Sequence, residues 1–291
     1  MINTIYSKFN NNPKPAIQGI DLNVMSFNIR YGTAKDGKNS WSHRRELVMN
    51  ILKDNHWDII GLQEALNFQL EEIRKEMHKY GSSGLGRDDG KDSGEHSSIL
   101  YRTDRFKIAK SGTFWFSTTP SVPGSKDWGA KMPRICSWVQ FIEKETKKNF
   151  LVYNVHLDHR SSQSRWKSME LLSKHIEIHS KNKIPVIVMG DFNVGENNPI
   201  IRYMKGENVR FGNKERNMIN PYPLNDSFRS VHKKASGTTF HMFWGNKFGP
   251  KLDYIFTSKN STIIESVINR ISYKGKYPSD HYPVASKVIL K

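Results

Sequence analysis

Short apolar runs with the composition of β-strands recur along the chain, and several of them follow one another directly. The predicted strands cover residues 22–29, 57–64, 97–102, 106–116, 135–142, 149–157, 184–190, 238–243, 252–258 and 282–290. Apolar residues at helical spacing predict helices over 43–55, 66–77 and 166–176. This irregular alternation predicts an α/β (α+β) architecture in which mixed β-sheets carry outer helices.

The composition is sufficient for one domain of this kind. The chain has 291 residues, of which 36% are hydrophobic, with 15 Phe, 11 Tyr and 7 Trp. Residues 1–21 are rich in Asn and Pro and lack periodicity, so we expect a flexible N-terminal arm followed by a single domain over 22–291, in a monomer. Residues 81–94, "GSSGLGRDDGKDSG", have neither the ending of a nucleotide-binding P-loop nor the acid spacing of a calcium loop, and we interpret them as a mobile loop.

Cysteine usage and hydropathy exclude several classes. Cys136 is the only cysteine, which rules out an internal disulfide and argues against a zinc site built from thiolates. No stretch approaches the roughly 20 apolar residues that a membrane helix needs. The first twenty residues lack the apolar region of a secretory signal, so we expect a cytoplasmic protein, with secretion left open in case a signal was removed.

The charge is strongly positive. The formal net charge is +17, from 45 Lys and Arg against 28 Asp and Glu. Such an excess attracts polyanions, including nucleic acids, anionic lipid head groups and phosphorylated small molecules. The basic residues are scattered rather than clustered, so a merely solvated surface is an equal alternative.

The stretch "MGDFNVGENNP" at residues 189–199 follows a buried strand and places Asp191 and Asn193 two residues apart. Residues i and i+2 of a strand share a face. A carboxylate and a carboxamide side by side suit a hard cation or a phosphate, although both residue types also favour ordinary turns.

Similar polar residues stand in or at the ends of other apolar strands, where function tends to concentrate. Each one alone has a structural explanation, such as a cap or a hydrogen-bonded core histidine. Burying all of them is costly unless they serve one another or a metal. The positions are Asn28, Glu64, Glu95, His156, Asp191, Asn193, Asp253, Asp280 and His281.

The motifs around these residues resemble the endonuclease/exonuclease/phosphatase superfamily, which includes deoxyribonuclease I, deadenylases, neutral sphingomyelinases and inositol polyphosphate 5-phosphatases. They occur in the family's order over residues 22–290 as "MSFNIR", "IIGLQE", "GEHSSILYR", "YNVHLDHR", "GDFN", "LDYIF" and "SDHYPV". The resemblance implies a four-layer α/β/β/α sandwich of two packed mixed sheets, with the site at one edge. The stretches "LGRDDG" and "SGTFWFS" are similar to a bacterial-type branch of stand-alone domains.

With this resemblance, the polar residues receive expected roles in phosphoester hydrolysis. Glu64 is the main expected metal ligand, supported by Asn28 and Asp280. Mg²⁺ suits such an oxygen-rich shell, with Mn²⁺ as a substitute. His281 is expected to activate water or to hold a phosphoryl oxygen.

The remaining roles concern partners of the imidazoles. Asp253 is expected to orient His281, and Glu95 to pair with His156 as the second imidazole. Asp191 would take or steer the attacking proton, and Asn193 would donate to the phosphate. Which histidine is the acid and which the base stays open.

Basic and aromatic residues complete the expected site. Arg134 in "MPRICSW" is expected to donate to phosphate, with a surface arginine as the equal alternative. Phe243 and Trp244 could stack a base or could pack in the core. Further basic residues expected around the cleft are His43, Arg44, Arg45, Arg87, Arg160 and Arg165.

These observations favour a divalent-metal-dependent phosphodiesterase or nuclease acting on DNA or RNA. One alternative is a phosphatase or phosphodiesterase for a small phosphorylated metabolite or a phospholipid head group. Another is a catalytically silent module that binds polyanions.

Overall fold

The computed structural model describes residues 19–53, 57–180, 184–211 and 218–291. Residues 1–18 of the predicted N-terminal arm lie outside this range, and strand β1 begins at Ile20, two residues before the expected boundary. No helix within the described ranges has the length and apolarity needed to cross a bilayer.

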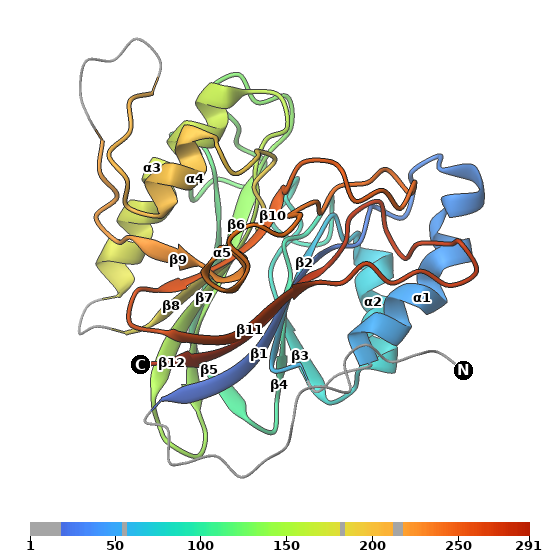
Figure 1. Cartoon of the computed structure of the whole chain (residues 1–291), viewed down its shortest axis with the longest axis horizontal. Helices are drawn as coiled ribbons and strands as arrows, with labels where there is room; N and C mark the ends of the chain where they lie inside the picture. Colours follow the sequence, from blue (N-terminus) through green and yellow to red (C-terminus); the bar gives the residue numbers. More distant parts are fainter. Residues whose placement is uncertain (1–18, 54–56, 181–183, 212–217) are drawn as a thin grey trace.

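The strands form two mixed sheets of six strands each (Figure 1). The first sheet has the order β11-β12-β1-β2-β4-β3, and the second has the order β5-β6-β7-β8-β10-β9. The first contains β1 (Ile20–Asn28), β2 (Ile59–Gln63), β3 (Tyr80–Ser83), β4 (Ile99–Arg102), β11 (Thr262–Ile268) and β12 (Val284–Leu290). The second contains β5 (Phe106–Trp115), β6 (Ile135–Glu143), β7 (Asn149–His156), β8 (Val186–Asp191), β9 (Leu224–Asp226) and β10 (Asp253–Ser258).

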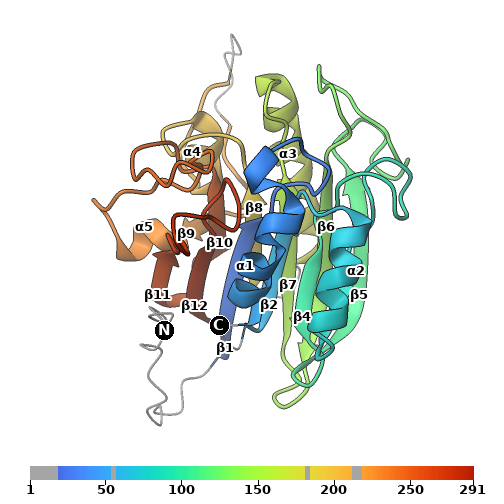
Figure 2. The same cartoon turned by 90° about the vertical axis from the view of Figure 1, so that its right-hand side faces the viewer.

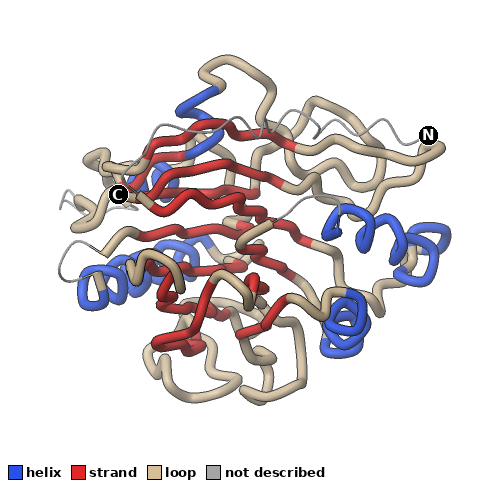
Figure 3. The backbone as a smooth tube through the Cα atoms, turned by 90° about the horizontal axis from the view of Figure 1, so that it is seen from below, coloured by secondary structure: helices blue, strands red, loops and turns tan. Residues whose placement is uncertain are grey.

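Helices cover the outer faces of both sheets, which completes the predicted four-layer α/β/β/α sandwich (Figures 2 and 3). Helices α1 (Trp41–Lys53) and α2 (Asn67–Glu76) pack on the first sheet, and α3 (Ser162–His179) and α4 (Pro199–Met204) pack on the second. The short elements η1 (Gly37–Asn39) and α5 (Ser227–Val231) lie in connections.

Strand alternation builds the three apolar layers between these elements. In β1, Leu22 and Val24 point to the other sheet, whereas Met25 and Phe27 point to α1 and α2. Successive strand side chains face opposite sides, so a strand with apolar residues on both faces must be covered twice. From Val24 to Phe27, β1 carries apolar residues on both faces, and this specifies a central position in the sandwich.

Two of the strand pairs are parallel, β1 with β2 and β7 with β8, whereas the others are antiparallel. Parallel neighbours need a crossover connection, which α1 and α3 provide. The carboxyl ends of these strands consequently meet at one edge of the sandwich.

Several predicted elements need correction. Residues 238–243 are not a strand: apart from an isolated bridge between Phe240 and His281, they form a loop in which Met242 and Phe243 have left-handed backbones. The Gly/Asp loop predicted from residue 81 starts inside β3. Strands β9 and β11 and helices α4 and α5 were not predicted. The sequence does contain a start signal for α5: Asp226 is its N-cap, and its side chain accepts from the backbone N of Phe228 and Arg229.

Candidate functional site

Polar side chains from both sheets converge at one end of the layer between the sheets. Asn28 ends β1, and His156 and Asp191 are register partners at the ends of β7 and β8. Asp253 begins β10 directly opposite Asp191. Each of these residues continues the alternation of the side chains that face the other sheet. The strand register therefore brings four polar positions that are far apart in sequence into one site.

A layer of buried amides separates these residues from the apolar core. Gln63 Nε2 donates to Asn154 Oδ1 at 2.6 Å and to Ser26 Oγ at 3.2 Å. Asn154 Nδ2 donates in turn to the backbone carbonyls of Leu62 and Ser98. Buried polar groups are stable when they are hydrogen-bonded. This layer links β1, β2 and β7, and so fixes the two sheets relative to each other beneath the site.

Glu64 enters the site through an unusual backbone conformation. Strand alternation would place its side chain with Leu62 on the helix-facing side, but the Glu64 backbone is left-handed, with φ 60°. Its Oε1 accepts from Asn28 Nδ2 at 3.0 Å, and its Oε2 accepts from the backbone N of Tyr31 at 3.1 Å. A non-glycine residue in this region costs roughly 1–3 kcal/mol and persists where the surroundings hold it. The strain marks Glu64 as a residue that the fold directs into the site.

Asp280 reaches the same corner from the loop before β12. The neighbouring Ser279 Oγ donates to the backbone carbonyl of Asn28 at 2.7 Å, which ties this loop to β1. Burial raises the pKa of Asp280, and nearby Glu64 adds to this rise, while His281 and Arg30 oppose it. Arg30 Nε lies 3.8 Å from Asp280 Oδ2. Asn28, Glu64 and Asp280 thus form an oxygen-rich corner with crowded negative charge.

Arg44 supports this corner from behind, and the prediction that it lies at the rim of the cleft is wrong. Its side chain is buried. Its guanidinium donates to the backbone carbonyls of Ile29, Arg30 and Pro278, and its Nε donates to that of Asn39. Because burial is incompletely compensated by Asp280 and other carboxylates, the pKa of Arg44 is lowered to about 10. Arg44 therefore joins the exit of β1 to the loop that carries Asp280.

His281 and Asp253 form a buried hydrogen-bonded pair, as the sequence pattern predicted. His281 Nδ1 lies 2.8 Å from Asp253 Oδ2, which leaves Nε2 directed toward Asp191 Oδ2 at 3.9 Å. Burial disfavours the charged imidazole, but Asp253, Asp191 and Asp280 together raise the pKa of His281 well above its usual range. The acidic environment of His281 therefore favours its protonated form.

His156 has the opposite environment. Its Nε2 lies 3.5 Å from Asp191 Oδ2, and its Nδ1 lies 3.7 Å from Glu95 Oε2, which is too long for a hydrogen bond. Glu95 Oε2 instead accepts from Arg87 NH1 at 2.7 Å. Burial, with the positive charges of Arg134 and Arg87, lowers the pKa of His156 well below its usual range. This environment therefore favours the neutral form of His156, and its expected pairing with Glu95 is a contact rather than a hydrogen bond.

Asp191 lies between His156 and His281 and also contacts Asn28. Its Oδ2 accepts from Asn28 Nδ2 at 3.1 Å, and its Oδ1 accepts from the backbone N of Asn193 at 2.8 Å. Burial and the nearby Asp253 raise the pKa of Asp191 to about 7. Asn193 has a left-handed backbone, with φ 52°, and its Nδ2 donates to Leu157 O at 3.0 Å. Asp191 is thus a buried carboxyl group able to exchange a proton near neutral pH.

Arg134 lies on the His156 side and is buried, not a surface arginine. Its NH2 lies 2.9 Å from His159 Nδ1, and its Nε lies 3.7 Å from Asp158 Oδ2. Its Nε and NH1 are buried without a hydrogen-bond partner among the described atoms. Asp158 and His159 were not predicted, although "HLDHR" places them directly after the end of β7. Arg30 was missed in the same way, immediately after "FNI".

The other predicted basic residues lie at different distances from this centre. Arg87 is buried beside Glu95. Arg160 is exposed, with its Nε 3.2 Å from His159 Nε2. Arg165 NH1 donates to Asp158 O at 2.8 Å and so supports the loop from behind.

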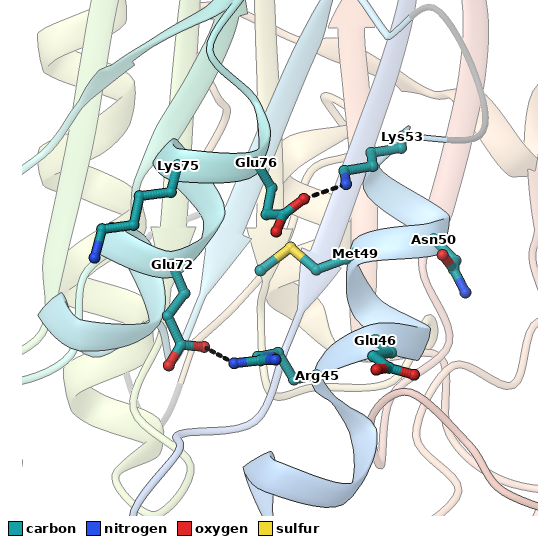
Figure 4. Close-up of a pocket in the computed structure, with 8 residues that line it drawn as sticks. All are labelled: Arg45, Glu46, Met49, Asn50, Lys53, Glu72, Lys75 and Glu76. Carbon is teal, nitrogen blue, oxygen red and sulfur yellow. Dashed lines mark hydrogen bonds and ion pairs between the residues drawn. The ribbon is translucent and has the colours of Figure 1, made fainter.

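Arg45 and His43 do not contact the site among the described residues. Arg45 lies 3.7 Å from Glu72 in a charged groove between α1 and α2, where Lys53 also pairs with Glu76 (Figure 4). His43 is exposed on α1. Two ion pairs, Arg45 with Glu72 and Lys53 with Glu76, bridge the groove, and the described residues that line it include none of those at the polar end of the sandwich.

Two residue sets could hold a cation. Asp191, Asp253 and His281 each offer a ligand atom within 4.8 Å of one another. However, His281 and Asp253 are already hydrogen-bonded to each other, so a metal there would have to break that bond. Glu64 and Asp280 provide carboxylate oxygens beside partly accessible space, which suits a cation that keeps some of its waters. Asn28 lies next to them, with its Nδ2 on Glu64 and its Oδ1 on the backbone N of Arg30, so it would have to turn its amide to become a ligand. The chemistry of the donors favours the second set, which is also the predicted one.

The profile of the Endonuclease/Exonuclease/phosphatase family matches residues 25–281. A mannosyl-6-phosphatase structure from Bacteroides thetaiotaomicron superposes with a TM-score of 0.81 and 34% identity, over 92% of this chain and 100% of that one. An uncharacterized protein of Acanthamoeba polyphaga mimivirus is 26% identical over 90% of this chain and 98% of its own length. The 3'-5'-exoribonuclease subunit Ccr4 of Kluyveromyces lactis is 22% identical over 85% of this chain, which spans 37% of that protein.

Proposed function

Because this chain belongs to the endonuclease/exonuclease/phosphatase family, whose members act on phosphoester bonds, we propose that it is a divalent-metal-dependent phosphoester hydrolase. One observation carries the proposal. Asp191 Oδ2 lies within 3.9 Å of the ring nitrogens of both His156 and His281 and accepts from Asn28. A carboxyl group, two imidazoles and an oxygen-rich corner around one point are the groups that phosphoester hydrolysis requires.

The cation would be held by Glu64, Asn28 and Asp280, and Mg²⁺ or Mn²⁺ fits this oxygen donor set. When bound, it would neutralise charge on phosphate oxygens. Crowding supports this assignment, because Glu64 raises the pKa of both Asp280 and Glu95 in addition to the effect of burial. Buried carboxylates that repel one another favour a bound cation.

The proton chemistry follows from the charges of the three central groups. Asp191 is the proposed base: a carboxylate with a pKa of about 7 can accept the proton of the attacking water near neutral pH. His281 is protonated and donates through Nε2 to a phosphoryl oxygen, where negative charge develops. Asp253 keeps His281 charged and fixes its Nδ1.

The remaining groups would bind and orient the phosphate. His156 is neutral and offers Nε2 on the Asp191 side. Asn193 donates one amide hydrogen to Leu157 O, which leaves the other for a phosphate oxygen. Arg134 has buried N–H groups without partners among the described residues, and such donors favour an anion.

Single-stranded or double-stranded nucleic acid is the leading proposed substrate. The formal charge of +17 favours polyanions, and a relative named as an exoribonuclease supports this class. A phosphorylated sugar is the second candidate, because the mannosyl-6-phosphatase is 34% identical and is matched along its whole length. A phosphatase and a nuclease would share the chemistry above and differ in what surrounds the phosphate.

A phosphoester screen with Mg²⁺, Mn²⁺ or EDTA tests the proposal. The panel contains plasmid DNA, RNA, oligonucleotides, hexose 6-phosphates and bis-p-nitrophenyl phosphate. We expect Mg²⁺-dependent turnover that Glu64→Gln reduces by about 10²-fold or more. Glu71→Gln, on the exposed side of α2, is the matched control and should retain activity.

Two outcomes would contradict the proposal. Equal activity of wild type and Glu64→Gln would exclude the metal corner. Nucleic-acid binding without hydrolysis in any divalent ion would instead favour the polyanion-binding alternative. Turnover of hexose phosphates without cleavage of nucleic acid would retain the hydrolase and select the second substrate class.

A further inference from the structure

Two loops beside the site carry large aromatic side chains that the fold leaves in solvent. Residues 240–249 precede β10, and residues 270–277 precede β12; Figure 1 shows them, in orange and red, at the end of the sandwich near α1. Trp244 is 75% exposed, Phe248 is 91% exposed and Tyr273 is 49% exposed. Together with the exposed Lys247, Lys274 and Lys276, these residues form what we call the aromatic rim.

The first of these loops is bonded directly to Asp280 and His281, in the loop before β12. The backbone N of His241 donates to Asp280 O at 2.9 Å, and that of Met242 donates to the same carbonyl at 3.2 Å. Phe240 forms an isolated bridge with His281. A substrate held by the rim would therefore lie beside the residues proposed to act on its phosphate.

The two loops also form one surface. The His241 ring stacks on Tyr282 at 3.8 Å and contacts Tyr277 edge-on at 4.9 Å. Tyr282 Oη donates to Asn246 O at 3.3 Å. The His241–Tyr277 contact joins the two loops directly, and Tyr282, which follows His281, anchors the first loop, while the aromatic rings of the rim remain exposed.

The backbone of the first loop is held in a conformation that side chains rarely adopt. Met242 and Phe243 have left-handed φ angles of 52° and 63°. This geometry turns Phe243 toward the Arg44 guanidinium, 6.0 Å from its ring, and leaves Trp244 outside. Strained residues of this kind cluster at ligand-binding sites. Exposed aromatic patches likewise mark interaction sites rather than packing.

The charge of the rim indicates an anionic partner. Neither 240–249 nor 270–277 contains an Asp or Glu, and the aromatic residues stand among lysines. Aromatic side chains that stack bases, alternating with cations that contact the phosphates between them, are the means by which proteins bind single strands without sequence preference.

We propose that the aromatic rim binds the bases and phosphates that flank the scissile phosphate of a single-stranded nucleic acid. This inference rests on the proposed function and assigns its substrate class. Trp244 and Phe248 would stack on unpaired bases, and the three lysines would contact neighbouring phosphates. The corresponding base pairs of a duplex do not expose their faces, so single strands should bind more tightly.

Binding of a fluorescent ten-residue oligothymidylate, followed by anisotropy, tests the proposal. All proteins carry Glu64→Gln so that the probe survives. We expect Trp244→Ala with Phe248→Ala to raise Kd about tenfold or more, consistent with stacking measured in other proteins. Replacing the three lysines by Ala should reduce the dependence of binding on salt. Ile178→Ala on α3, which removes a side chain that is 59% exposed, is the control.

An unchanged Kd in the aromatic double variant would overturn the proposal. The proposal would also fail if the aromatic double variant lost duplex binding and single-strand binding equally. It would fail as well if this variant lost binding to vesicles containing anionic lipid but still bound the oligonucleotide. Hydrolysis by the protein with wild-type Glu64, measured beside Glu64→Gln, reports separately on the proposed function. If the protein showed metal-dependent hydrolysis but the rim substitutions left Kd unchanged, only this inference would be rejected.

Discussion

His156 and His281 both contact Asp191 Oδ2, at 3.5 and 3.9 Å, but they belong to oppositely charged halves of the site. His281 faces the carboxylates of Asp253, Asp191 and Asp280, which raise its pKa despite burial. His156 faces Arg134 and Arg87, whose positive charges add to burial in lowering its pKa. The surroundings therefore favour a charged imidazole in one half and a neutral imidazole in the other.

This difference in charge assigns different catalytic roles to the two histidines, which their residue type alone does not. A buried imidazolium with a fixed carboxylate partner can stabilise developing negative charge and donate a proton. A neutral imidazole can donate one N–H, accept a hydrogen bond and orient neighbouring groups, but it carries no positive charge to stabilise developing negative charge. The comparison predicts that the acidic half carries most of the catalytic effect, and that the basic half mainly binds the phosphate.

The largest expected effect separates the two histidines directly. We expect His281→Asn to reduce kcat about 10³-fold, because it removes both the charge and the proton donor. His156→Asn should reduce kcat only about 10-fold to 10²-fold. Steady-state hydrolysis of the best substrate from the screen measures both, with circular dichroism to verify folding. Equal reductions of kcat in the two variants would contradict the proposed division of roles between His281 and His156.

The carboxylate partners provide a sharper comparison. Asp253 is bonded to His281 at 2.8 Å, whereas Glu95 is 3.7 Å from His156 and is bonded to Arg87. We expect Asp253→Asn to reduce kcat about 10²-fold, since it leaves the imidazole without its charge partner. Glu95→Gln should reduce kcat less than 10-fold. A larger effect of Glu95→Gln would show that His156 depends on its carboxylate after all.

Arg134 tests the binding role of the basic half. Lys keeps the charge but loses the planar set of donors. We expect Arg134→Lys to raise KM about 10-fold and to change kcat by less than 3-fold, because the proposed contact with the phosphate would be made in the ground state and the transition state alike. Arg202→Lys, at an exposed position on α4, is the matched control. A fall in kcat with KM unchanged would place Arg134 among the groups that act in the transition state.

The fold could be predicted largely because apolar runs leave a strong local signal. The strands that end in Asn28, His156 and Asp191 were all recognised by composition, and the motifs implied their common edge. The error at 238–243 has a different origin: "TTFHMF" has strand composition, but its backbone follows contacts with Asp280 and His281 that are remote in sequence. Tertiary contacts outweigh local propensity in such segments.

The sequence predicted which residues form the candidate site better than it predicted their protonation states. Nothing in "SDHYPV" or "YNVHL" distinguishes a protonated histidine from a neutral one, because the pKa depends on groups that only the folded chain brings together. The role of Arg44 was likewise hidden, since its partners are backbone carbonyls of residues 29, 30, 39 and 278. A hydrogen bond to a backbone carbonyl does not depend on the residue type of the partner, so no sequence motif reveals it.

The smallest expected effect concerns stability, and it tests the neutral state of His156 without any substrate. Its pKa is depressed in the folded protein, whereas an unfolded histidine has a pKa of about 6.5. Below that pH the unfolded chain binds a proton that folded His156 refuses, so acidification must reduce stability. Between pH 7.5 and 5.5, in EDTA, we expect the free energy of unfolding to fall about 1.4 kcal/mol more in wild type than in His156→Gln. Urea unfolding at both pH values measures this difference, and His43→Gln on the exposed face of α1 should behave as wild type. If His156→Gln kept the full acid sensitivity, His156 would be protonated in the folded protein, and both halves of the site would carry a charged imidazole.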